Sequence, residues 1–177
     1  QVNINGGTLV GQSEYNEGST STYPAIINGS NEGKINITGG NMSCAKTNVL
    51  YNKLAGTITL SGNPVITSTV SAAVTNAGTG TIIINGGKIT SPTGKVSVVN
   101  YSTGTVTVGN ASAAISKTNP CIAGGNSVKN SNGGTFNFYN GIIKGSGAIY
   151  GGTLNNKRSG ATYTTSTEGS YKTAFYQ

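Results

Sequence analysis

The sequence predicts an all-β protein with a single domain: a parallel β-helix, or β-solenoid, of about seven coils, each with three short strands and a repeat period of about 23–24 residues. Three observations predict it. A phrase recurs along the chain, apolar and polar residues alternate inside that phrase, and Gly, Asn, Thr and Ser dominate the composition. The 177 residues are enough for one continuous core.

The recurring phrase begins with glycine. It reads GKINITGGNM, GTITLSGNPVI, GTIIINGGKI, GTVTVGNASAAI and GTFNFYNGII, starting at Gly33, Gly56, Gly80, Gly104 and Gly134. The first four of these glycines lie about 23–24 residues apart and the last two about 30 residues apart, and such self-similarity at a nearly fixed period indicates a repeat architecture. QVNINGGTL at the start of the chain is the same phrase, separated from the next copy by a longer interval. The two longer intervals predict insertions near residues 11–22 and 125–133.

Within the phrase, every second residue is apolar, as expected for a strand with one buried face. We predict an inward core stack of Ile35, Ile37, Ile58, Leu60, Ile82, Ile84, Val106, Val108, Phe136 and Phe138. After a glycine corner a third inward position follows, at Leu9, Met42, Ile66, Ile89, Ile115 and Ile143. The segment before each phrase adds Ile26, Leu50, Val74, Val98 and Ile122.

The links between these strands are short and rich in Gly and Asn, which tolerate the left-handed backbone conformation of tight corners. Strands of three to five residues with links that do not reverse direction cannot form hairpins, so the chain is expected to coil. Each strand then pairs in parallel with its copy one coil away, at about 4.8 Å.

An asparagine column accompanies the repeat. Asn28, Asn52, Asn76 and Asn100 follow one another at equal intervals of one repeat period, and the next slot is Gly124. Stacked amide side chains hydrogen-bond from strand to strand in such arrays. We therefore predict a structural ladder that stops at Asn100.

The repeat covers residues 1–154, and the stretch 155–177 departs from it. A solenoid end leaves strand edges and core open, so this stretch is interpreted as a cap or a linker to a next module. Tyr163 and Tyr171 lie in it. The alternative is that these tyrosines form an exposed patch that binds a glycan or a protein.

The strand ending in Asn, followed by GTI-x-I and GG-x-I, resembles the right-handed parallel β-helix repeats of large bacterial surface proteins and, more loosely, the pectate-lyase-like superfamily. The resemblance covers Gln1 to about Thr153. It implies a secreted or cell-surface adhesin or stalk, with adjacent modules in the same parent chain. Its alternative implication is a protein that binds or cleaves carbohydrate. Lyases of this fold use calcium held by acidic residues with a Lys or Arg base, and its glycosidases use paired carboxylates.

The residues themselves argue against catalysis. The chain has no Asp and no His, and its four acidic residues are Glu14, Glu17, Glu32 and Glu168. Glu14 and Glu17 share the first insertion and are interpreted as part of a solvated loop, although they are the one candidate carboxylate pair. A Ser-His triad cannot form without His. We predict no enzyme activity, cofactor or metal.

Two cysteines, Cys44 and Cys121, fall several coils apart in this arrangement. A disulfide requires Cα atoms within about 7 Å. We therefore predict two free, semi-buried thiols, and two distant cysteines cannot form a structural zinc site.

The net charge of +7 arises from scattered basic residues without a basic block, which does not favour specific nucleic-acid binding. No apolar run is long enough for membrane insertion. A host or environmental glycan or protein is the expected partner. Ice binding is a remote alternative, because a regular threonine array is predicted on one outer face, at Thr57, Thr59, Thr105 and Thr107.

Overall fold

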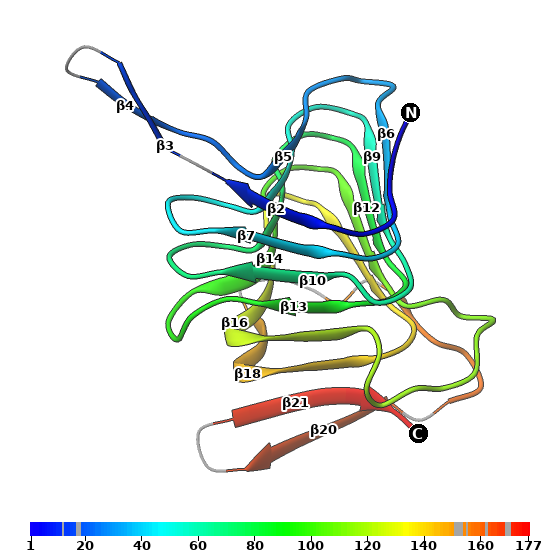
Figure 1. Ribbon diagram of the computed structural model, residues 1–177. Coiled ribbons are helices and arrows are strands. Elements are labelled where there is room, and N and C mark those ends of the chain that lie inside the picture. Colours follow the sequence, from blue (N-terminus) through cyan, green and yellow to red (C-terminus); the bar gives the residue numbers. More distant parts are fainter. Residues whose placement is uncertain (12, 17–18, 151–153, 155, 162, 169–170) are drawn as a thin grey trace.

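The computed structural model describes residues 1–177 except 12, 17–18, 151–153, 155, 162 and 169–170. The described residues form strands, turns and loops without a helix. Figure 1 shows the chain winding around one axis, with strands of successive coils stacked above one another. The predicted parallel β-helix with three strands per coil is confirmed.

The first face of the solenoid is a seven-stranded sheet in which every pair is parallel. Each residue pairs with its repeat copy, so that Ile82 lies between Ile58 and Val106. The strands in order are β1 (Val2–Ile4), β6 (Lys34–Ile37), β9 (Thr57–Leu60), β12 (Thr81–Ile84), β15 (Thr105–Val108), β17 (Thr135–Phe138) and β19 (Asn156–Lys157).

The second and third faces form one continuous sheet, because two long strands cross the corner between them. These shared strands are β16 (Cys121–Asn130) and β18 (Ile142–Tyr150). The second face also contains β2 (Thr8–Gly11), β7 (Asn41–Cys44), β10 (Val65–Ser68) and β13 (Lys88–Thr90). The third face also contains β5 (Ile26–Asn28), β8 (Leu50–Asn52), β11 (Val74–Asn76) and β14 (Val96–Asn100).

The core runs along the axis between the three faces. All ten residues of the core stack point inward and are buried, Ile35 at 7% exposure and the other nine at 0%. Burying an aliphatic or Phe side chain contributes about 1.5–3 kcal/mol. The β-branched residues that predominate also suit a pleated, buried surface. Strands of only four residues therefore persist because every second side chain enters one shared core.

The asparagine ladder is confirmed, and it is longer than predicted. The Nδ2 groups of Asn52, Asn76 and Asn100 donate to the Oδ1 of the next asparagine at 2.9, 3.0 and 2.8 Å, and the last of these acceptors is Asn130. Each amide also donates to the carbonyl of the glycine four residues later, as Asn130 does to Gly134 at 2.6 Å. The prediction that the ladder stops at Asn100 is wrong.

Asn28 belongs to the column but not to the ladder. Its Nδ2 donates to the carbonyls of Gly33 and Thr57 at 3.0 and 3.3 Å. The turn after Asn28 has one more residue than the later turns, so its glycine is five residues away instead of four. The Oδ1 of Asn52 is consequently buried with no hydrogen-bond partner among the described residues.

The extra residues of the first long interval include β3 (Ser13–Asn16) and β4 (Ser19–Thr22), an antiparallel pair that extends away from the coils (Figure 1). The second insertion is not at 125–133, because those residues continue β16 and the turn to β17. The looped-out residues lie at 110–120, ahead of β16.

This shift changes two core assignments. Ile115, predicted to point inward, is 42% exposed in the inserted loop. Ile122 takes the place expected for Ile115, since it pairs with Ile89 and Ile143 on the second face. Val128 occupies the place expected for Ile122, opposite Val98 on the third face.

Residues beyond the coils form an antiparallel hairpin of β20 (Tyr163–Glu168) and β21 (Tyr171–Tyr176). Strand β21 pairs antiparallel with β18, so it covers the last strand of the second face (Figure 1). The Tyr176 ring is buried with its centroid 5.0 Å from that of Phe138. Its hydroxyl donates to the Phe138 carbonyl and accepts from the Arg158 backbone N–H at 3.0 Å.

Candidate functional site: a lysine-lined groove

The inserted loop 110–120 is held against the last two coils. Asn140, which is buried beyond the end of β17, accepts from the Ser116 N–H and donates to the Ala114 carbonyl, both at 2.7 Å. Nearer β16, the Oδ1 of Asn119 accepts from the Gly87 N–H at 2.7 Å. The loop therefore has a defined position although most of its residues are exposed.

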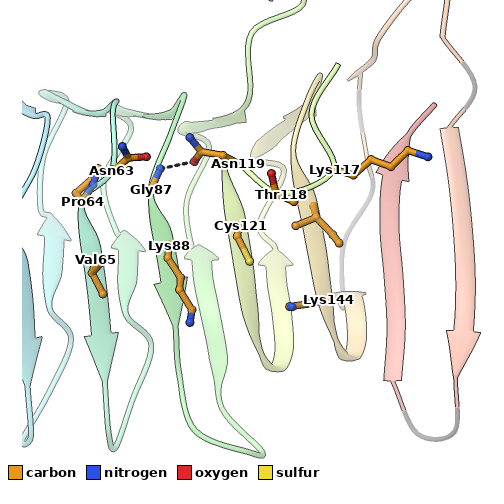
Figure 2. Close-up of a pocket in the computed structure, with 11 residues that line it drawn as sticks. Asn63, Pro64, Val65, Gly87, Lys88, Lys117, Thr118, Asn119, Cys121 and Lys144 are labelled. Atoms are coloured by element: carbon orange, nitrogen blue, oxygen red, sulfur yellow. Dashed lines mark hydrogen bonds between the residues drawn. The ribbon is translucent and has the colours of Figure 1, made fainter. Parts of the chain in front are cut away.

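A groove of about 420 Å³ lies between this loop and the outer side of the second face. Its floor comes from consecutive strands, and its wall comes from the loop and from the turn before β10. Figure 2 shows the residues that line it: Asn63, Pro64, Val65, Gly87, Lys88, Lys117, Thr118, Asn119, Cys121, Ile142 and Lys144.

Strand register brings the floor residues together. Lys88 pairs with Cys121, which pairs with Ile142, so three outward side chains form one row across β13, β16 and β18. Lys144 follows Ile142 by two residues and therefore points to the same side of the sheet. Figure 2 shows Lys88 and Lys144 on either side of the strand that carries Cys121.

The third lysine belongs to the loop and turns toward the C-terminal hairpin. The Nζ of Lys117 lies 5.1 Å from the centroid of the Phe175 ring and donates to the Oε1 of Gln177 at 3.5 Å. Its ammonium group thus points away from Lys88 and Lys144 and ties the loop to β21 (Figure 2).

The lining contains three lysines and no carboxylate. Like charges gathered in a cleft produce a local potential that attracts ions of the opposite sign. An ammonium group offers three hydrogen-bond donors and no acceptor. The residues on the groove wall and floor thus suit the binding of an anion, and they include neither a carboxylate nor an imidazole for acid–base chemistry.

The repeat pattern does not predict this groove, because its lysines are scattered along the sequence and the long interval places the insertion at 125–133. Lys88, Lys117 and Lys144 share no repeat position. One local signal could have corrected the register: Asn130 precedes Gly134 by four residues, as Asn52, Asn76 and Asn100 precede Gly56, Gly80 and Gly104.

The predicted threonine array lies on the outer side of the first face. Thr57, Thr81, Thr105 and Thr135 pair in register on consecutive strands. The second row is less regular, because Ile83 lies between Thr59 and Thr107 and Asn137 donates to the Thr107 hydroxyl at 3.0 Å. The four predicted threonines are half-buried, and the array is interrupted at both ends by Lys34, Asn36 and Asn137.

The side chains of the other candidates lie outside the described residues. Tyr163 pairs with Tyr176 and Tyr171 pairs with Glu168 in the hairpin backbone, but the side chains of Tyr163 and Tyr171 lie outside the described residues. Glu14 is in β3, its side chain is likewise outside the described residues, and Glu17 is not described.

The two cysteines are free, as predicted. Strands β10 and β13 separate Cys44 on β7 from Cys121 on β16. Cys44 is fully buried instead of semi-buried, with the Thr47 N–H donating to its Sγ at 3.3 Å. Cys121 is half-buried on the groove floor.

Among the described residues, no cluster of three or more His, Cys, Asp or Glu could hold a metal ion. None of the described segments forms an apolar helix long enough to cross a bilayer. No protein-family model, curated protein or solved structure matches this chain.

Proposed function

We propose that this chain is a non-enzymatic, extracellular β-helix module of a bacterial surface adhesin or stalk, and that it presents a binding surface to a host or environmental glycan. The observation that carries the proposal is the groove at loop 110–120, which is formed on a solenoid held together by one core and one asparagine ladder. Loops on a rigid scaffold are common recognition sites.

The composition supports binding over turnover. Glycosidases need two carboxyl groups about 5–10 Å apart, one to protonate the leaving oxygen and one to act as nucleophile or base. The chain offers four Glu and no Asp, and the groove is lined by none of them.

The test is a glycan array combined with a reducing-sugar release assay on one protein preparation. We expect retention of particular glycans without release of sugar. Sugar release that depends on Glu14 and Glu17 would replace this proposal with the carbohydrate-active alternative.

A second candidate function, ice binding, is favoured by the in-register threonines of the first face. Thermal hysteresis that is lost in Thr81→Lys would support it, because the long charged side chain would interrupt the row of threonines at its centre. No hysteresis at millimolar protein would exclude it.

A further inference from the structure

Two lysines of the groove floor are placed to act on one ligand. Lys88 lies beside Cys121 in register, and Lys144 lies beside Ala123, on the opposite neighbouring strand of β16. Their Cα atoms are about 12 Å apart, because two strand spacings across the sheet and two residues along it lie between them. Lysine side chains are long and flexible, so both ammonium groups can converge on a ligand above β16.

The charge of this pair is not compensated within the groove. Lys88 and Lys144 are exposed, and the remaining lining is neutral apart from a third lysine, Lys117. No acidic residue lines the groove. An anion entering the groove would therefore meet positive charge from its floor.

The kind of cation indicates the kind of anion. Arginine matches carboxylate and phosphate with two parallel hydrogen bonds, whereas lysine acts as a compact point charge with three donors. The only arginine, Arg158, is not in the lining. Separate lysines approaching from different strands suit a tetrahedral oxyanion, whose three terminal oxygens point in different directions.

The rest of the groove suits a sugar ring. Its volume of about 420 Å³ is within the range of small-molecule sites. Val65 and Ile142 provide apolar floor, while Thr118 and Asn119 place a hydroxyl and an amide on the wall. Such a mixture of apolar surface and a few polar groups fixes the orientation of a ligand.

We propose that the groove binds a sulfate ester carried by a polysaccharide, with Lys88 and Lys144 contacting the sulfate. This inference rests on the proposed glycan-binding function and specifies its ligand: a sulfate is a tetrahedral oxyanion that glycans carry as an ester group.

The test compares three polymers with one backbone: dextran sulfate, carboxymethyl-dextran with a matched degree of substitution, and dextran. Affinities are measured by biolayer interferometry on the full chain at fixed ionic strength. We expect dextran sulfate to bind at least tenfold more tightly than carboxymethyl-dextran, and dextran not to bind.

The variant is Lys88→Gln with Lys144→Gln, and its control is Lys46→Gln with Lys95→Gln. The control has the same net charge, and its two exposed lysines lie outside the groove. We expect at least a tenfold loss of dextran sulfate affinity in the variant and less than a twofold change in the control. All four lysines are exposed, so both proteins should keep the wild-type urea midpoint.

Each of the other possible results of these binding experiments contradicts one part of the proposal. An equal loss in variant and control would mean attraction to the net charge and not binding in the groove. Equal affinity for the carboxymethyl polymer would reject the sulfate ester, and the glycan array would then test glycan binding separately. No binding to any polymer rejects this inference, and only an empty glycan array rejects the proposed function as well.

Discussion

At the scale of single residues, hydrogen bonds to buried amides decide where the coils lock together. Asn76 donates to Gly80 and Asn100 and accepts from Asn52, so all of its polar atoms are used inside the protein. A buried donor or acceptor left without its partner costs about 1–3 kcal/mol. The ladder therefore stabilises the solenoid chiefly because its loss would leave buried amide groups without hydrogen-bond partners.

Asn76→Ala is expected to lower the free energy of unfolding by about 1–2 kcal/mol, because it leaves donors and acceptors in the neighbouring coils unpaired. Asn28→Ala should cost less, since Asn28 makes no ladder bond to Asn52. Urea denaturation of both variants measures the difference at unchanged m-value. Equal losses would mean that the ladder bonds add nothing beyond the bonds to backbone carbonyls.

Tyr176 links stability to pH at the C-terminal end. Burial raises the pKa of its phenol above the usual value of 10.0, and the hydrogen bond from the Arg158 N–H lowers this pKa in part. Well below pH 10, the phenol keeps its proton in both the folded and the unfolded state, and its contribution to the free energy of unfolding is fully present. Above it the unfolded state ionises first, so the free energy of unfolding falls as pH rises through the folded-state pKa.

Tyr176→Phe should therefore be less stable than the wild type at pH 8, by about 1–3 kcal/mol, because the Phe138 carbonyl and the Arg158 N–H lose their partner. Between pH 10 and 11.5 its stability should fall less steeply than that of the wild type. Urea midpoints measured across this range test the difference. Parallel pH profiles would show that the phenol does not titrate with unfolding.

At the scale of elements, the alternation of inward and outward side chains defines each strand. Shifting a strand by one residue exchanges its two faces, so the register is strongly specified wherever one face enters the core. Neighbouring residues of β12 show the contrast: Ile84 is fully buried, whereas Ile83 faces outward between Thr59 and Thr107.

Ile84→Asp is expected to unfold the protein, because it buries an unpaired charge in the central coil. Ile83→Asp, the same change one residue earlier, should leave a folded protein with a modestly lower urea midpoint. Circular dichroism and urea denaturation of the two proteins decide the point. A folded Ile84→Asp protein would show that the inward side of β12 has been assigned wrongly.

At the scale of the whole molecule, a stack of coils has two ends, and exposed strand edges promote association. At the C-terminal end β21 pairs with the first half of β18 and Tyr176 covers Phe138. Strands β3 and β4, by contrast, pair only with each other in the described part of the chain.

Deleting residues 158–177 is expected to lower stability and cause self-association, because it opens the edge of β18 and removes the Tyr176 ring from the core. Replacing residues 12–22 with two glycines should leave both properties unchanged. The backbones of Gly11 and Tyr23 are close, since a Cβ at Gly11 would lie 2.9 Å from the Tyr23 carbonyl oxygen. Size-exclusion chromatography with light scattering measures the self-association of both variants, and urea denaturation measures their stability. A monomeric truncated protein with an unchanged midpoint would contradict the capping role of the hairpin.

The sequence by itself determined the coil. Inward positions, glycine corners and the asparagine spacing are local patterns, and most of them recur once per repeat period, so the repeats can be aligned without knowing any contact. The tertiary structure decided what local patterns leave open. The extra residues at 110–120 are partly offset by a shorter corner within β16, between the part that pairs with β13 and the part that pairs with β14. Only this pairing fixes which residues leave the coil. The place of Ile122, the fifth asparagine and the lysines of the groove all follow from that pairing, because they depend on contacts between strands distant in sequence.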